Sequence, residues 1–312
     1  MTPGDVSDLT VSTVDDLAEI RDRVARHLVG RERELELVLS AVGAGRDIVL
    51  EGPPGTSKTT LLRAITTEWG IPLLFVEGNA DLTPSRLIGH HNPARVLRED
   101  YSAENFVPGP LVEAMREGGF LYIEEFNRAP DDTLNTLLTA MAERQVTVPR
   151  VGTTTAKPSF RVIASMNPYD NVGTVRLSTS ISDRLCRLSV DYQDDAAERD
   201  IVVLRTGLSI EDRLVADAVA VTRATRVHPD VRQGSSVRGA IDLALVATEV
   251  SELRGVTTRD DERYPQVVFD AMTVALSGRI QLDEAAETTP ELVLRQIWED
   301  HFLLGPHTAA PG

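Results

Sequence analysis

The sequence predicts an α/β fold with a five-stranded parallel sheet flanked by helices, followed by an all-α domain. Up to about residue 190, short apolar runs alternate with segments whose apolar residues have helical spacing, which is the pattern of βαβ units. From an acidic run at 191–198 onward, almost every segment has helical spacing alone. We therefore expect four parts: an N-terminal helical extension (1–26), a sheet-containing core (27–192), a helical domain (193–304) and a disordered tail (305–312).

Composition and charge narrow the class of protein. The formal net charge of −16 gives no long-range attraction to a polyanion, so we do not expect a nucleic-acid partner. No apolar run approaches the roughly 20 residues of a membrane-spanning helix, and the N-terminus lacks the basic and apolar regions of a secretory signal. The single cysteine, Cys186, excludes a disulfide framework within the chain, and its alternating surroundings predict a buried strand residue. We expect no membrane contact and a cytoplasmic location.

The first third of the chain is predicted to contain three helices, two strands and an irregular segment. Each helix has apolar residues at helical spacing, and each strand is a short apolar run. A turn rich in Gly and Pro separates the first strand from the helix after it. The helices span 14–29, 32–42 and 61–69, and the strands span 47–50 and 72–76. The irregular segment, which contains several prolines, is 78–105.

The middle of the chain supplies the remaining strands. Pro and Gly residues bound the next helix at its start and its end, and the apolar run after it ends in two acids. Asp131 and Asp132 are expected to cap an amphipathic helix that includes Leu134 to Met141. A loop rich in Gly and Thr, 151–157, is expected to join the next two strands. The other predicted elements are strands at 120–123, 145–148, 159–164 and 185–190, and helices at 111–117, 177–184, 202–208, 214–225, 237–253, 267–276 and 290–303.

The turn after the first strand has the pattern of a phosphate-binding loop. Glycines let successive backbone N–H groups turn toward one centre, and the following helix points its positive end at the phosphates. Lys58 is predicted to reach the β- and γ-phosphates, and Thr59 to ligate Mg²⁺. Ser57 replaces the second Gly of G-x-x-x-x-G-K-[ST], and we expect it to adopt the right-handed helical conformation. The candidate nucleotide-binding residues are Gly52, Pro53, Gly55, Thr56, Ser57, Lys58, Thr59 and Thr60.

Polar residues follow the third and fourth strands of the predicted parallel sheet. Glu124 and Glu125 lie at the carboxyl end of a strand, where α/β sheets bind ligands. Glu124 is expected to hold the Mg²⁺ shell, and Glu125 to orient or deprotonate the attacking water. Asn167 is a candidate to position that water. The alternative, which the local pattern favours, is an Asn that opens a turn before Pro168.

Two segments that contain histidine leave alternatives open. Residues 27–31 can be a plain connection between helices, or an apolar pocket for a nucleotide base that includes Val29 and Gly30. Both interpretations remain open. His90 and His91 have no carboxylate or cysteine at ligand spacing, so we expect a loop or an inserted functional element there and not a metal site.

In combination these motifs resemble the MoxR family of AAA+ ATPases over residues 27–302. Each motif alone is weak, and their order and spacing make the set specific. The motifs are Val29-Gly30-Arg31-Glu32, the phosphate-binding loop, Phe106-Val107-Pro108-Gly109-Pro110, Glu125-Phe126-Asn127-Arg128-Ala129-Pro130, Met141-Ala142-Glu143-Arg144-Gln145-Val146-Thr147-Val148, Ala164-Ser165-Met166-Asn167-Pro168, Asp183-Arg184 and Gly234-Ser235-Ser236-Val237-Arg238.

The resemblance implies an AAA+ P-loop NTPase core with a helical lid. It implies a homo-oligomeric ring, expected to be a hexamer, with ATP and Mg²⁺ bound between subunits. By position, the Walker A pair is Lys58 and Thr59, the Walker B pair is Glu124 and Glu125, sensor 1 is Asn167, the arginine finger is Arg184, and the sensor 2 arginine of the lid is Arg238. It further implies a chaperone or remodelling motor that works with a partner carrying a von Willebrand factor A (VWA) domain to mature or activate a client complex.

Departures from the family pattern qualify this expectation. Glu124 stands where Walker B usually has Asp, and the longer side chain can shift the Mg²⁺ shell, so we expect slow hydrolysis. The alternatives are a DNA-dependent AAA+ motor, a magnesium-chelatase-like ATPase subunit, and a scaffold that assembles on ATP and hardly hydrolyses it. An insert at 90–105 and a hairpin at 148–160 are expected to face the ring pore or a partner.

Overall fold

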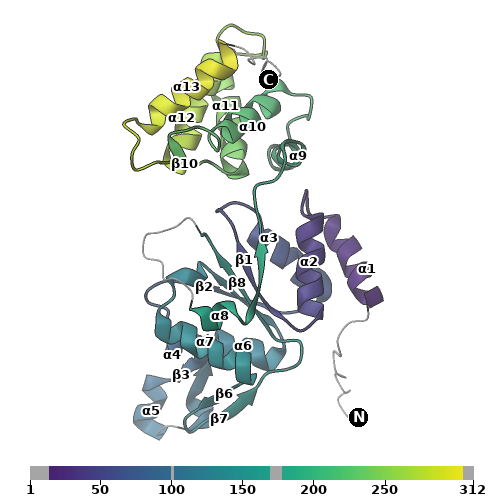
Figure 1. Ribbon diagram of the computed structural model, residues 1–312, viewed down its shortest axis with the longest axis vertical. Helices are drawn as coiled ribbons and strands as arrows, with labels where there is room; N and C mark the ends of the chain where they lie inside the picture. Colours follow the sequence, from purple (N-terminus) through teal and green to yellow (C-terminus); the bar gives the residue numbers. More distant parts are fainter. Residues whose placement is uncertain (1–13, 100–101, 169–177, 305–312) are drawn as a thin grey trace. The chain divides into compact units, whose positions relative to one another are not determined.

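The computed structural model describes residues 14–99, 102–168 and 178–304 (Figure 1). These residues fall into two compact units that divide at Asp191: the first takes in those up to 53 and 57–191, and the second 54–56 and those from 192 on. Across the described ranges, no helix is both long enough and apolar enough to cross a membrane. The start of the predicted N-terminal extension, the predicted tail and Leu177 lie outside the described residues.

A five-stranded parallel sheet forms the centre of the first unit, as predicted. Its strand order is β2-β5-β8-β1-β9, and every neighbouring pair is parallel. The carboxyl ends of β1, β8 and β5 therefore lie side by side at one edge of the sheet. The five strands are β1 (Asp47–Glu51), β2 (Leu73–Glu77), β5 (Phe120–Glu124), β8 (Arg161–Met166) and β9 (Leu185–Ser189).

Apolar residues on alternate sides of the strands bury both faces of this sheet. Successive side chains of a strand point to opposite faces, so Ile48 and Leu50 pack on one side and Val49 on the other. Together with the helices that cover the two faces, the sheet forms three layers. The first face carries α1 (Val14–Ala25), α2 (Glu32–Gly43) and α3 (Lys58–Trp69), and the second carries α4 (Pro84–Ile88), α6 (Pro110–Glu117) and α7 (Asp131–Glu143).

Helix α1 belongs to the first unit and is shorter than predicted. Its residues Ile20 and Val24 are buried in the core with α2 and α3. The helix ends at Ala25 rather than Val29, because the chain turns there: the His27 N–H donates to the Val24 carbonyl at 2.9 Å, a tight i to i+3 bond. The prediction for α2 is confirmed to within one residue.

The segment expected to be irregular is largely ordered into short elements. Pro84 begins α4 and Pro93 begins α5 (Pro93–Glu99), since the first turn of a helix does not need the N–H that proline lacks. Between them, β3 (Gly89–His91) pairs antiparallel with β4 (Phe106–Pro108). Prolines therefore start elements in this segment, and the expectation of an irregular loop is wrong.

Three further predictions are wrong in detail. The expected Gly/Thr loop contains β7 (Gly152–Thr155), which pairs antiparallel with β6 (Gln145–Val148) in a hairpin outside the main sheet. Asp131 and Asp132 lie in the first turn of α7, and Pro130 occupies the N-cap position, so neither Asp caps the helix. Cys186 is exposed, because β9 is an edge strand of the sheet.

The second unit is built on helices that share one apolar core. Its first helix begins at Asp195 rather than Val202, because the Asp194 carboxylate accepts the Ala197 N–H at 2.8 Å and caps it. Two short strands, β10 (Val231–Gln233) and β11 (Gln281–Leu282), pair antiparallel, so the unit is not entirely helical. The helices are α9 (Asp195–Thr206), α10 (Arg213–Ala224), α11 (Val237–Arg254), α12 (Tyr264–Leu276) and α13 (Pro290–Phe302).

Candidate functional site

The predicted phosphate-binding loop connects β1 to α3 at the carboxyl edge of the sheet. Gly55 has φ 79°, a left-handed conformation that glycine adopts without strain. The Lys58 ammonium donates to the carbonyls of Gly52 at 2.9 Å and Pro53 at 2.8 Å. Lysine Nζ thus lies at the centre of its own loop, where a phosphate group would bring negative charge next to it.

Ser57 differs from its predicted conformation. It has φ 65° and ψ 17°, which is left-handed and not the right-handed helical conformation expected at a helix start. A residue with a Cβ pays roughly 1–2 kcal/mol in this region. That strain is the physical reason why a glycine suits this position, and Ser57 keeps the loop geometry at an energetic cost.

Replacing Ser57 with glycine is therefore expected to stabilise the protein. We expect the free energy of unfolding of Ser57→Gly to rise by about 0.5 kcal/mol, since relief of the left-handed strain exceeds the added freedom of glycine in the unfolded chain. Chemical denaturation measures the change. As a matched control, Ser40→Gly in the exposed interior of α2 should lower stability by about 0.5 kcal/mol. A loss of stability in Ser57→Gly would contradict the strain.

Thr59 and Glu124, the two predicted Mg²⁺ ligands, lie next to each other. The Thr59 hydroxyl donates to the Glu124 carboxylate at 3.0 Å, although α3 and β5 are far apart in the sequence. Hard oxygen ligands of this kind, one hydroxyl and one carboxylate, suit Mg²⁺ together with phosphate oxygens. The two residues therefore fit the predicted ion.

A buried tyrosine adjoins this pair and was not among the predicted site residues. The Tyr122 hydroxyl lies 3.1 Å from Thr59 Oγ1, 2.9 Å from Ser165 Oγ and 3.5 Å from Glu124 Oε1. Burial raises the pKa of the Tyr122 phenol, and its hydrogen bonds to Ser165 and Thr59 work in the opposite direction. The sequence contains a signal for this cluster, because alternation puts Tyr122 and Glu124 on one face of β5.

Glu125 and Asn167 are held by two neighbours from the segment after β5. Glu125 has φ 52° and forms an ion pair with Arg128 at 2.9 Å. Both side chains are about two-fifths exposed, so the ion pair adds little stability and is readily exchanged. The Asn127 amide donates to the Asn167 carbonyl at 3.5 Å, which ties the end of β8 to the segment that follows β5. Asn127 and Arg128 were not among the predicted site residues.

The two segments with open interpretations form parts of the first unit. Val29 and Gly30 lie in the connection between α1 and α2, where Gly30 has φ 63°. The next residue, Arg31, is buried and donates to Glu34 at 2.8 Å and to the Asp191 carbonyl at 2.7 Å. His90 and His91 lie on β3, and no group of three or more potential metal-binding side chains occurs among the described residues.

Arg184 lies at the opposite edge of the sheet from the phosphate-binding loop. It directly precedes β9, whose first residue pairs with Asp47 at the start of β1, whereas the loop follows the last residue of β1. The two edges are about 16 Å apart along the strand. The exposed Arg184 side chain donates to the Ser180 carbonyl at 2.9 Å. It therefore lies too far along the strand to contact the loop of its own chain.

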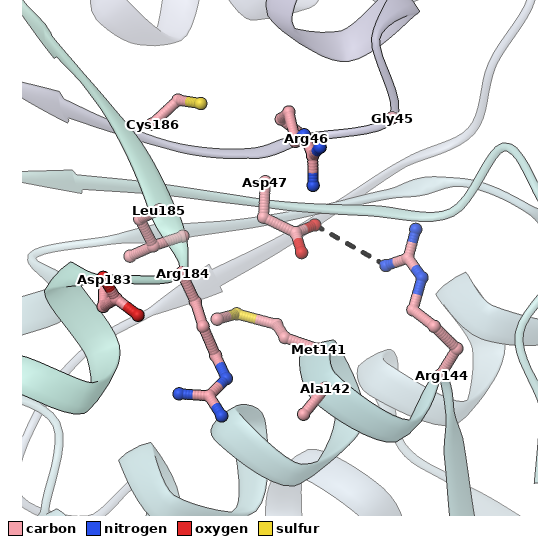
Figure 2. A pocket seen from close by; sticks show the side chains of 10 residues that line it. All are labelled: Gly45, Arg46, Asp47, Met141, Ala142, Arg144, Asp183, Arg184, Leu185 and Cys186. Carbon is pink, nitrogen blue, oxygen red and sulfur yellow. Dashed lines mark ion pairs between the residues drawn. The ribbon is translucent and has the colours of Figure 1, made fainter.

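Arg184 lines a cavity of about 480 Å³ at that edge (Figure 2). The side chains of Arg184 and Arg144 flank Met141 and Ala142, and Arg144 forms an ion pair with Asp47 at 3.7 Å. Burial raises the pKa of Asp47, while its bond from the Val162 N–H and the charge of Arg144 work in the opposite direction. Three basic side chains, those of Arg46, Arg144 and Arg184, line this cavity.

Arg238 lies in the first turn of α11 in the second unit, and its side chain is exposed. The loop before this helix is fixed by Arg226, which donates to the Ser235 carbonyl at 2.7 Å and forms an ion pair with the buried Glu198 at 2.8 Å. Tyr192 stacks on the Arg226 guanidinium at 4.0 Å. The N-terminus of α11 is thus held by contacts within the second unit.

Comparison with known proteins relates the chain to ATPases. Residues 47–185 match the AAA domain family, dynein-related subfamily. The gas vesicle ATPase GvpN of Ancylobacter aquaticus is 29% identical over 80% of this chain and 72% of its own. An uncharacterized protein of Staphylococcus epidermidis is also 29% identical, over 73% of this chain and 89% of its own.

Solved structures share the fold. A protein of Cytophaga hutchinsonii that is described as an ATPase, 23% identical, has a TM-score of 0.50 over 90% of this chain and 92% of its own. A mutant of Thermotoga maritima RuvB, 16% identical, has a TM-score of 0.53 over 81% of this chain and 72% of its own. Together with the parallel sheet and the helical second unit, these likenesses confirm the predicted fold class.

Proposed function

We propose that this chain is a MoxR-type AAA+ motor that hydrolyses ATP between the subunits of a homo-oligomeric ring, which we expect to be a hexamer. The match to the AAA domain and the likeness to the gas vesicle ATPase GvpN support the ATPase class. The site geometry supports the ring and the residue roles, and the resemblance to the MoxR family supports the motor.

In the proposed site, the phosphate-binding loop and the residues around it hold the nucleotide and the attacking water. The phosphate-binding loop and Lys58 hold the triphosphate, and Thr59 and Glu124 hold Mg²⁺, which offsets the phosphate charge when bound. Glu125 accepts a proton from the attacking water, and Asn167 orients that water. Glu125 must exchange its ion pair with Arg128 to do so, which costs little because both side chains are about two-fifths exposed. We attribute the expected slow turnover to Glu124, whose side chain is longer than the usual Asp.

The position of Arg184 is the observation that carries the ring proposal. Its separation from the loop of its own chain supports a role in a second copy of the chain, next to that copy's γ-phosphate. A guanidinium there stabilises charge that develops in the transition state. We propose that Arg238 reports the nucleotide state to the helical lid in the same ring.

Size-exclusion chromatography with light scattering tests the assembly. We expect ATP or a non-hydrolysable analogue with Mg²⁺ to convert the protein into a ring, because each bound nucleotide bridges two subunits and so favours the assembled form by mass action. ADP and nucleotide-free samples should contain smaller species. A chain that remains monomeric in all three states would leave Arg184 without a nucleotide to act on and would contradict the proposal.

We further propose that the motor remodels or matures a protein complex with a VWA-domain partner. A chain with a net charge of −16 is a poor match for DNA, which favours a protein client. The related GvpN is a gas vesicle ATPase, which is compatible with work on a protein assembly. Affinity capture from the native host with the Glu125→Gln variant and ATP should recover a VWA-domain protein, and its absence would count against this part of the proposal.

A further inference from the structure

We propose that Tyr122 is a positioning residue for the Mg²⁺ site: its hydroxyl, held by Ser165, fixes the Thr59 hydroxyl so that one oxygen lone pair stays directed to the metal. This inference rests on the proposed role of Thr59 and Glu124 as Mg²⁺ ligands. It concerns a side chain that lies in the middle of a strand and is fully buried.

The order of the strands explains why such a residue is needed. Thr59 follows β1 and Glu124 ends β5, and β8 lies between these two strands. The Tyr122 hydroxyl bridges this separation: it lies 2.9 Å from Ser165 Oγ on β8 and 3.1 Å from Thr59 Oγ1 on α3. Tyr122 and Ser165 are both fully buried, so water does not compete for the contact between their two hydroxyls.

Only one set of donors satisfies all four contacts of the cluster at once. A carboxylate only accepts, so Thr59 must donate its single proton to Glu124 at 3.0 Å. Thr59 can then only accept from Tyr122. Tyr122 therefore shares its one phenolic proton between Thr59 Oγ1 and Glu124 Oε1, which lie 3.1 and 3.5 Å from the phenolic oxygen. Since Tyr122 has no second proton, Ser165 must donate to Tyr122.

These hydrogen bonds limit how the Thr59 hydroxyl can bind a metal ion. Its hydroxyl oxygen has two lone pairs, and one accepts the proton of Tyr122. The other lone pair is the single place left for a metal ion, and the hydroxyl cannot rotate without breaking two hydrogen bonds. Tyr122 thereby orients the ligand before the ion arrives, and pre-organisation of this kind lowers the cost of binding.

The test measures how Mg²⁺ changes the affinity for a fluorescent ADP analogue, mant-ADP, and does not depend on hydrolysis. In Tyr122→Phe, the Mg²⁺ concentration that gives half of the affinity gain should rise about fivefold, the effect of one net hydrogen bond. Affinity in EDTA should match that of the unmodified protein, because the role proposed for the phenol is to orient a metal ligand and not to hold the phosphates. A half-saturating Mg²⁺ concentration within a factor of two of the original would overturn the inference.

Tyr264→Phe is the matched control for loss of a buried hydroxyl. That hydroxyl donates to Asp217 at 2.9 Å in the second unit, so its loss should reduce stability but leave the Mg²⁺ dependence unchanged. A change in Mg²⁺ dependence as large as that of Tyr122→Phe would attribute the effect to stability and overturn the positioning role.

Two further comparisons separate the possible failures. Ser165→Ala should raise the half-saturating Mg²⁺ concentration about twofold, and the double variant Ser165→Ala/Tyr122→Phe should resemble Tyr122→Phe alone, because Ser165 acts only through Tyr122. If the half-saturating Mg²⁺ concentration of the double variant rises by the product of the two single effects, Ser165 does not act through Tyr122 alone. Thr59→Ala and Glu124→Gln should lose the Mg²⁺ response. If they keep it, the proposed metal site fails; if they lose it and Tyr122→Phe does not change, only the present inference fails.

Discussion

The Glu125→Gln variant should hydrolyse ATP at least about 10²-fold more slowly than the unmodified protein, because an amide cannot accept the proton of the attacking water. Nucleotide affinity should change little, since Glu125 is not among the residues proposed to hold the phosphates. Phosphate release at saturating ATP gives kcat, and titration with mant-ADP gives the affinity. Loss of kcat with unchanged affinity is the behaviour of a group that acts in the transition state.

A matched control comes from the exposed Glu113 on α6. Glu113→Gln makes the same chemical change outside the site and should keep the original rate. Equal rates in Glu125→Gln and the unmodified protein would remove the assignment of Glu125 as base. If both rates are also close to zero, the scaffold that binds ATP and hardly hydrolyses it becomes the better description of this chain.

Removal of the Arg184 guanidinium should also reduce hydrolysis strongly. We expect Arg184→Ala to lower kcat by about 10³-fold, the contribution of an arginine that stabilises charge on the transferred phosphoryl group. The binding of mant-ADP to single subunits should be unaffected, since Arg184 lies at the far edge of the sheet from its own loop. Arg46→Ala serves as the control, because Arg46 is exposed and lines the same cavity.

Mixing two inactive variants distinguishes action within one subunit from action between subunits. Arg184→Ala keeps Glu125, and Glu125→Gln keeps Arg184, so a mixed ring contains sites in which one subunit supplies the base and its neighbour the arginine. Activity should therefore return in the mixture, up to about a quarter of the original if subunits assemble at random. A mixture as inactive as its components would contradict a role for Arg184 between subunits.

Local patterns in the sequence were sufficient for the sheet and most helices. Apolar runs and their boundaries predicted all five parallel strands, proline and glycine signals located α6, and helical spacing of apolar residues located α11. The error about Cys186 has its physical origin in contacts between distant residues. Cys186 is exposed because its strand ends the sheet, and the strand order cannot be read from an alternating pattern.

The site shows the same division between local and long-range information. The pair formed by Thr59 and Glu124 was predicted from motif chemistry, and the structure brings the two within 3.0 Å. The conformation of Ser57 was predicted wrongly, because a small residue before a helix is compatible with a right-handed conformation, whereas its φ is 65°. Tyr122 and Ser165 were missed, since each is an ordinary strand residue until the fold places their hydroxyls 2.9 Å apart.

Strand β8 sets the width of the gap that the nucleotide chemistry has to span. It is flanked on one side by the strand that leads into Lys58 and on the other by the strand that ends in Glu124. A core substitution in β8, such as one at the buried Ile163, can therefore shift both partners without touching either. Selections for faster or slower turnover should return changes along this spacer, where an inspection limited to nucleotide-contacting residues would overlook them.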